Sequence, residues 1–565
     1  MSSLDGSPGR RDSGKLPLWA GLLCLCLALA CSARAAVPRL PVDQEEPGGV
    51  VELTVEEVQR GLRSGRFTAE GITLEFLDRI RRFEPAYNAI ISMNPAALEE
   101  ARALDEEYRL KGPRGPLHGV PLVIKDNIDY GGLVTTAGYS GFSTAAGGID
   151  MVPDDDASVV ERLRGAGAII LAKTNMPDFA GHGTRTESSV AGVTLNPYNV
   201  EKAPGGSSGG TATAVNASFA VAGLGTETGG SIQNPSSAQA LVGVKPTFGL
   251  VPLEGVVPMS ATYVDVVGPI ARNVWDAATI LDVIAGPTEE DPRTAEAVGH
   301  LPPAGYAAGL SETALVGKRF GLVGPGWRTS FLPLAPETEE FYGEAIAALE
   351  AQGASVVEDP FAGTDFIQKY QERRGTRSAG EDEMSGYLEG LGEDASFHSI
   401  REWEELTGEA FRRGSGNRQG RPQRSDSARS LPRGGSEEPT PPDSTLTFPE
   451  WRRGIQELFR SVLEENDLDG LFFPQAGAPI PDLVEDPSRP DYNPNNHPEL
   501  PSNIVNDMGL PVVTLPFGYY EDGTPFVLAF IGDIWTEPEL LAYAYDLEQA
   551  VSGRVPPHLS ESPRR

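Results

Sequence analysis

Two short, uninterrupted apolar runs, at residues 120–124 and 168–171, constrain the fold of this chain more than any other feature. Neither run alternates with polar residues, and this pattern is typical of strands buried on both faces. Residues 157–166 between them have helical spacing and follow Asp156, which we expect to cap that helix. A strand, a helix and a second strand in succession predict an α/β fold.

The rest of the chain continues this pattern. Residues 51–110 are predicted to be helical, and the alanine-rich residues 211–222 are predicted to form a tightly packed helix. Towards the C-terminus the pattern predicts a helix from residue 448, strands at 471–473, 511–515 and 526–531, and a closing helix over 537–551. We therefore expect one large domain over residues 50–552.

Residues 1–36 have the pattern of a signal peptide. Three basic residues precede an apolar run at 16–30, and Ala33-Arg34-Ala35 forms a small-x-small cleavage site. The run is shorter than the roughly 20 residues that a membrane-spanning helix needs. We expect cleavage near Ala35 or Ala36 and export to the periplasm or the outside, with no stable membrane association afterwards. An uncleaved membrane anchor is the alternative.

All three cysteines, at positions 24, 26 and 31, lie in this segment. A cleaved protein would contain none, which excludes disulfides, thiolate metal sites and a cysteine nucleophile. The formal net charge of −34 argues against nucleic acid as a partner. The sequence leaves the oligomeric state open.

Residues 375–446 differ in composition from the rest. Between positions 412 and 433 arginines greatly outnumber acidic residues. The remaining positions are mostly glycine, serine, proline and glutamine, and apolar residues do not recur at helical or strand spacing. We expect this Arg-rich insertion to be disordered or a loose surface loop, with a basic recognition arm as the alternative.

Two Gly/Ser clusters are candidates for chemistry. The first, residues 204–210, formally matches a nucleophile elbow around Ser207, but a turn-rich segment precedes it where the elbow needs a strand. In the second, residues 225–232, an apolar stretch enters a turn where the N–H groups of Thr228, Gly229, Gly230 and Ser231 could converge on one oxygen. That arrangement indicates an oxyanion hole. A tight turn without chemistry is the alternative.

A serine nucleophile needs a base. The six histidines are scattered and form no local metal motif, so no metal site is expected. A lysine can act as the base if burial lowers its pKa. Lys125, Lys173 and Lys245 each follow an apolar run, and local reasoning leaves the choice among them open.

Together, these motifs resemble the amidase signature family: residues 119–127 (GVPLVIKDN), 173–176 (KTNM), both Gly/Ser clusters and 243–247 (GVKPT) occur in its order and spacing. The resemblance covers most of residues 50–550 and implies an α/β/α sandwich with a mixed central sheet. It also implies a triad in which Ser231 is the nucleophile, Ser207 after a cis Gly206–Ser207 peptide relays the proton, and Lys125 is the base. The oxyanion hole would then be formed by the backbone of residues 228–231.

This sequence departs from the family pattern beside the triad. Glu227 replaces the commoner aspartate, and Gln233 with Asn234 replaces a pair that usually contains arginine. The resemblance implies that Ser208 and Glu227 support the triad, and these departures bear on that support. Glu227-Thr228 before the glycines is similar to the peptide-amidase branch.

The resemblance implies an amidase that hydrolyses a small-molecule or peptide amide through an acyl-enzyme, with no metal or organic cofactor, and the signal segment predicts that it is exported. One alternative is an amidotransferase A-type subunit that acts on aminoacyl-tRNA, against which the signal segment argues. Another is a non-catalytic binding protein with the same fold, against which the intact triad argues.

Overall fold

The computed structural model describes residues 49–372, 381–411, 447–484, 498–551 and 553–562. The predicted signal peptide lies outside these residues, so export stays a prediction. Within the described part of the chain, no helix combines the length and apolar character needed to cross a membrane.

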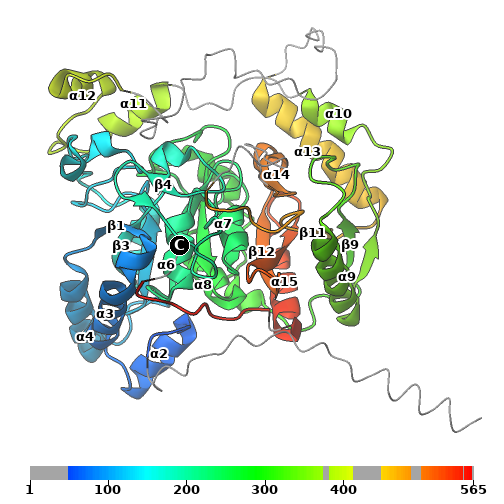
Figure 1. Cartoon of the computed structure of the whole chain (residues 1–565), viewed down its shortest axis with the longest axis horizontal. Helices are drawn as coiled ribbons and strands as arrows, with labels where there is room; N and C mark the ends of the chain where they lie inside the picture. Colours follow the sequence, from blue (N-terminus) through cyan, green and yellow to red (C-terminus); the bar gives the residue numbers. More distant parts are fainter. Residues whose placement is uncertain (1–48, 373–380, 412–446, 485–497, 552, 563–565) are drawn as a thin grey trace, which may run out of the picture. The chain divides into compact units, whose positions relative to one another are not determined.

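The core is a single eleven-stranded sheet, which crosses Figure 1 from β1 and β3 on the left to β9 on the right. Parallel pairs such as β2–β3 and β2–β6 alternate with antiparallel pairs such as β6–β8 and β12–β13, so the sheet is mixed. In spatial order its strands are β1 (Ile90–Met93), β3 (Ile169–Thr174), β2 (Pro121–Lys125), β6 (Ala222–Glu227), β8 (Val266–Ala271), β7 (Val242–Lys245), β12 (Val512–Tyr519), β13 (Pro525–Ile531), β11 (Gly470–Pro474), β9 (Arg319–Leu322) and β10 (Ser355–Val357).

Helices cover the sheet. Every residue of β2, β3, β6, β7 and β8 is buried, so both faces of the central sheet are covered, as continuous apolar runs predict. The predicted α/β fold with a mixed sheet is confirmed. The helices are α2 (Val55–Ser64), α3 (Ala69–Tyr87), α4 (Ala97–Lys111), α5 (Ser158–Gly165), α6 (Gly209–Asn216), α7 (Gln233–Ala238), α8 (Val274–Ile284), α9 (Pro336–Ala351), α10 (Phe366–Gln371), α11 (Glu381–Glu389), α12 (Ile400–Thr407), α13 (Phe448–Glu465), α14 (Ser502–Met508) and α15 (Glu537–Val551).

Three local predictions differ from the structure. The segment 51–110, predicted as helical, also contains the edge strand β1, which pairs with β3. The predicted helix 211–222 ends at Asn216, because the chain must turn back before β6 begins at Ala222. Asp156 does not cap α5: its carboxylate instead accepts a hydrogen bond from the Gly131 backbone and contacts Arg164.

The first part of the predicted insertion is folded. Residues 381–411 contain α11 and α12, whose buried Met384, Leu388 and Trp403 pack with Phe142 and Phe179. The expectation of disorder over the whole of 375–446 is therefore wrong for this part. Residues 412–446, where the arginines gather, lie outside the described residues.

Candidate active site

The site residues gather at one edge of the sheet. Strands β2 and β6 are neighbours and run parallel, so their carboxyl ends meet there. Lys125 is the last residue of β2, and Glu227 is the last residue of β6. The loop at 204–208 leads into α6 and the turn at 228–231 leads towards α7, so both Gly/Ser clusters lie beside the strand ends.

Lys125 is fully buried and lies 2.7 Å from Ser207, measured from Nζ to Oγ. Its Nζ also donates to the carbonyl oxygen of Thr226 (3.0 Å) and to the hydroxyl of the same residue (2.9 Å). Burial lowers the pKa of Lys125 to about 7, although Glu227 and Asp265 partly oppose this. A neutral amine has two hydrogens and one lone pair. With both hydrogens on Thr226, the lone pair faces Ser207.

The other two candidate lysines have different partners. Lys173 bonds to the Thr135 hydroxyl and lies 3.8 Å from the Asp126 carboxylate. Lys245 donates to the carbonyl oxygens of Pro246 and Leu510, both at 2.8 Å. Burial lowers the pKa of both lysines, that of Lys245 to about 8. Since neither has a hydrogen bond to Ser207 in the described part of the chain, the geometry favours Lys125.

The loop that carries Ser207 is tightly held. Its Gly206–Ser207 peptide is cis, as the family resemblance implies. Gly205 has a φ of +77°, and a Cβ there would lie 2.4 Å from the Cα of Pro235, so only glycine fits. Ser208 donates its N–H to the Ser231 carbonyl (3.2 Å) and its hydroxyl to the Thr226 carbonyl (3.2 Å). Ser208 therefore joins the two Gly/Ser clusters.

The turn at 228–231 offers unused donors. Among the hydrogen bonds of the described residues, none is donated by the backbone N–H of Gly229, Gly230 or Ser231. The Thr228 hydroxyl donates to the buried Asp265 carboxylate (2.6 Å), whose pKa burial raises. Ser231 is 6% exposed. Free backbone N–H groups beside a nearly buried serine are the elements of an oxyanion hole.

Glu227 fixes the end of this turn. Its carboxylate accepts hydrogen bonds from the backbone N–H of Ile232 (2.7 Å) and Gln233 (3.0 Å). The Gln233 side chain and Asn506 Nδ2 (2.8 Å) donate to its other oxygen. Glu227 and Gln233, which both depart from the family pattern, are therefore direct partners: the Gln233 amide donates a hydrogen bond to the Glu227 carboxylate.

Four contributors were missed by sequence reasoning: Thr226, Asn127, Asp265 and Asn506. Thr226 and Asn127 lie within the motifs at 225–232 and 119–127, but neither was assigned a role; the Asn127 side chain donates to the Thr226 hydroxyl (3.1 Å). Position next to a strand end could have indicated both. Asp265 and Asn506 come from distant segments without a motif. Among the described residues, no group of three His, Cys, Asp or Glu side chains could hold a metal ion.

Comparison with known proteins identifies the family. The family model described as Amidase matches residues 71–541. The chain belongs to the amidase family. Among curated relatives, the A-type subunit of the glutamyl-tRNA(Gln) amidotransferase from Synechococcus sp. is 31% identical over 516 residues, covering 88% of this chain and 96% of the relative. In other such subunits the match is shorter: the one from Symbiobacterium thermophilum is 41% identical over 320 residues, 56% of this chain and 62% of the relative.

Solved structures of this amidase fold include a peptide amidase from Stenotrophomonas maltophilia. It is 31% identical, with a TM-score of 0.68, and the match covers 91% of this chain and all of that one. An amidase family protein from Bacillus anthracis is 28% identical with a TM-score of 0.68, covering 90% of this chain and 93% of that one. The chain is therefore similar to a peptide amidase over most of its length.

Proposed function

We propose that this amidase-family chain hydrolyses a carboxylic amide through an acyl-enzyme on Ser231. The observation that carries the proposal is the direct contact of a fully buried Lys125 with Ser207, beside a turn with unused N–H donors. A lysine with a pKa near 7 is neutral in a large fraction of molecules at neutral pH, so it can accept a proton.

The proposed steps move one proton along the triad. Neutral Lys125 takes the Ser207 proton, Ser207 takes the Ser231 proton, and Ser231 Oγ bonds to the substrate carbonyl carbon. The N–H groups of residues 229–231 hold the oxyanion. When the C–N bond breaks, the proton returns through Ser207 to the leaving nitrogen, and ammonia or an amine departs. Water then attacks the ester by the same relay and releases the acid.

A fluorophosphonate probe tests the nucleophile, and we expect peptide mapping to find the probe on Ser231. Ser231→Ala should abolish both labelling and amide turnover. Ser207→Ala should keep a nucleophile that is poorly activated and lose on the order of 10²–10⁴ in rate, the usual effect of a positioned proton relay. Probe attached to Ser207 would overturn this assignment. A folded protein that no probe labels would favour the non-catalytic binding protein.

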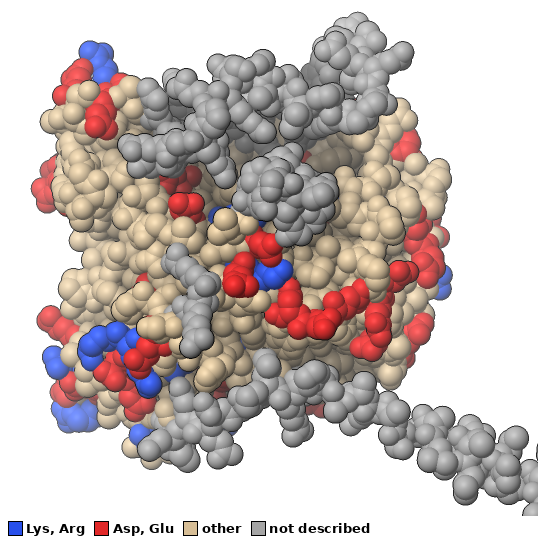
Figure 2. Space-filling model, viewed as in Figure 1, with Lys and Arg blue, Asp and Glu red and all other residues tan. Residues whose placement is uncertain are grey.

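A second candidate function is that of an amidotransferase A-type subunit. The names of the curated relatives favour it over a free-standing amidase. The chain spans about 60% of the length of several of these relatives but 96% of the one from Synechococcus sp., and it matches the whole length of the peptide amidase, so coverage does not separate the two candidates. Figure 2 shows rows of acidic side chains on the visible face, with basic ones mostly at the lower left, which does not favour tRNA binding.

Ammonia release by the isolated chain separates the two candidates. We expect turnover of simple and peptide amides without any partner protein. An amidotransferase subunit should instead act on glutamine, and turnover of glutamine alone would support that candidate.

Export is part of the main proposal and rests on the pattern of residues 1–36. N-terminal sequencing of the protein from its source cells should begin close to Val37, because the small-x-small site ends just before it. Recovery of the intact chain beginning at Met1 in the cytosol would contradict export and would remove the objection to an aminoacyl-tRNA substrate.

A further inference from the structure

The turn at 228–231 is held by a side-chain contact at its first residue. Strand β6 ends at Glu227, which lies opposite Val266 in the antiparallel ladder with β8. One step further along this ladder, Thr228 lies opposite Asp265, the residue that immediately precedes β8. The Thr228 hydroxyl donates to Asp265 Oδ1 at 2.6 Å. Because Asp265 is only 6% exposed, water competes little for this bond.

Asp265 also closes the loop over residues 258–265. Its second oxygen, Oδ2, accepts the backbone N–H groups of Met259 (2.8 Å) and Ser260 (2.6 Å). The Ser260 carbonyl accepts the N–H groups of residues 263, 264 and 265 in turn, at 3.1, 2.9 and 3.2 Å. Burial raises the pKa of Asp265, and its three hydrogen bonds oppose the rise. The loop and the turn therefore share one buried carboxylate.

Two helices hold this loop from outside. On α11, Glu383 Oε1 accepts the N–H of Thr262 at 2.7 Å. On α13, the guanidinium of Arg452 donates to the Tyr263 carbonyl. The loop is thus anchored to the rest of the fold independently of the turn that it supports.

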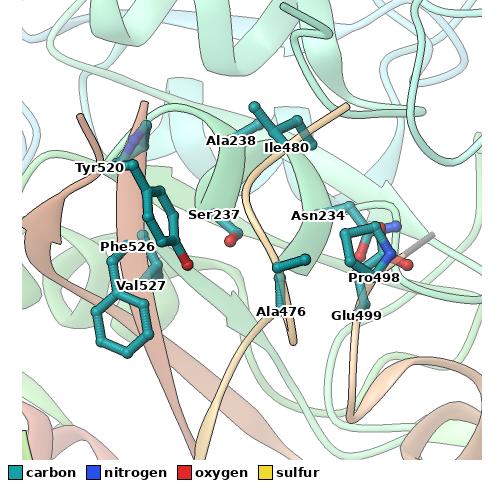
Figure 3. Close-up of a pocket in the computed structure, with 12 residues that line it drawn as sticks. Asn234, Ser237, Ala238, Ala476, Ile480, Pro498, Glu499, Tyr520, Phe526 and Val527 are labelled. Carbon is teal, nitrogen blue, oxygen red and sulfur yellow. The ribbon is translucent and has the colours of Figure 1, made fainter. Parts of the chain in front are cut away.

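The middle of the turn has a different neighbour. The Gly230 carbonyl accepts the Asn234 N–H (2.7 Å), and a Cβ on Gly230 would lie 2.8 Å from Asn234 Oδ1, so α7 lies against this part of the turn. Asn234 also lines a small cavity with Ser237 and Ala476, as Figure 3 shows. Close packing is therefore incomplete around Asn234. This makes the fastening at the start of the turn more important for its position.

The charge of Asp265 also bears on the base. Burial is the largest influence on the pKa of Lys125 and lowers it, whereas Glu227 and then Asp265 raise it. Glu383 on α11 adds to the rise that burial causes in the pKa of Asp265. Loss of the negative charge at position 265 should therefore lower the pKa of Lys125 further.

We propose that Asp265 is a positioning residue for acyl transfer: through Thr228 it holds the turn at 228–231 so that the backbone N–H groups converge on one oxygen. Its charge also acts on Lys125. A donor that is displaced from the developing oxyanion stabilises it much less, so the position of the turn affects the rate. The inference rests on the proposed function, because Ser231 is taken as the nucleophile and this turn as its oxyanion hole.

The rate at which a fluorophosphonate labels Ser231 tests the proposal without a known amide substrate. In this reaction Ser231 Oγ bonds to phosphorus, its proton passes to Ser207, fluoride leaves, and the phosphonyl oxygen takes the place of the oxyanion. Asp265→Asn should lower the second-order labelling rate constant roughly tenfold to a hundredfold, part of the effect of losing one oxyanion-hole donor. The acidic limb of the labelling rate should also move to lower pH, a shift that a merely structural role would not produce.

Thr228→Val removes the same contact from the other side, and it serves if Asp265→Asn does not fold. It should lower the labelling rate by a similar factor. If Asp265 acts through Thr228, the double variant should label no more than about twofold more slowly than the slower single variant.

Asp546→Asn is the matched control. Asp546 on α15 is 2% exposed and accepts the N–H of Leu315 (2.8 Å). This variant should change neither the labelling rate constant nor the position of the acidic limb.

The outcomes are distinguishable. Wild-type labelling rates in the single variants, or losses that multiply in the double variant, would overturn the positioning role. An acidic limb that stays in place in Asp265→Asn would overturn the action of its charge on Lys125. If the wild-type protein takes up no probe on Ser231, the proposed function itself fails.

Discussion

Lys125 determines how activity should depend on pH. Its ammonium form has no lone pair for Ser207, and burial holds its pKa near 7, so kcat/KM should rise as the pH increases through about 7. Lys125→Ala should lower the rate by on the order of 10²–10⁴ and remove this acidic limb. A pH–rate profile with a simple amide measures both effects.

Lys173→Ala is the matched control, because Lys173 is equally buried but is paired with Thr135 and Asp126. That variant should retain the acidic limb whatever it does to stability. Loss of the limb in Lys173→Ala, or its survival in Lys125→Ala, would contradict the assignment of the base.

At the same scale, sequence reasoning predicted some of the site and missed the rest. It identified both Gly/Ser clusters and three possible lysines, because glycines, a serine and a lysine after an apolar run are local signals. The preference for Lys125 came only from the family resemblance, since the contact with Ser207 joins residues from different segments. Asp265 and Asn506 act through contacts made by folding, and no spacing in the sequence predicts those contacts.

At the scale of elements, burial explains which predictions succeeded. Strands such as β2 and β13 are buried at every residue, so each leaves an uninterrupted apolar run. The edge strand β1 is only partly buried, so it has no uninterrupted apolar run. It is also short and lies between helices α3 and α4, so the whole segment was predicted as helical. Helices α11 and α12 were missed because the polar, Arg-rich composition that follows them dominated the prediction for 375–446.

The part of this insertion beyond Phe411 provides a prediction about loops. If residues 412–443 form a solvated loop, their deletion should change the free energy of unfolding by no more than about 1 kcal/mol, because loop closure depends only logarithmically on length. Chemical denaturation of wild type and deletion variant measures this, and activity on simple amides should persist. Loss of folding or of that activity would mean that the segment packs on the core or the site.

At the scale of the whole molecule, the C-terminal segment joins distant parts of the fold. Arg554 is nearly buried and makes two hydrogen bonds of 2.8 Å to Glu52, close to the N-terminal end of the described chain. It also donates to the Ala240 carbonyl after α7 (2.8 Å) and to Asn216 at the end of α6 (3.1 Å). Helices α6 and α7 follow the two Gly/Ser clusters. Arg554 therefore connects the C-terminal ends of the two helices whose N-terminal ends lie at the site.

Replacing Arg554 should therefore lower the free energy of unfolding. Burial alone would raise the pKa of Glu52, but Arg554 reverses this and lowers it, so the pair is a strongly interacting one. Arg554→Leu leaves the half-buried carboxylate of Glu52 without its main partner, and we expect a loss of about 2–3 kcal/mol in the free energy of unfolding, less than for a fully buried pair. Urea denaturation at pH 7 measures it. The loss should shrink as the pH falls through the pKa of Glu52, because the protonated side chain no longer needs a cation.

Glu561 on the same segment is the control. Its ion pair with Arg82 joins two side chains that are 59% and 61% exposed, so solvent screens it. Glu561→Ala should change stability by no more than about 1 kcal/mol, as exposed pairs usually do. Similar losses in the two variants would mean that the Arg554 contacts are not special and that the segment merely covers the surface. A large loss in Arg554→Leu alone would show that this arginine holds Glu52 and the ends of helices α6 and α7 together.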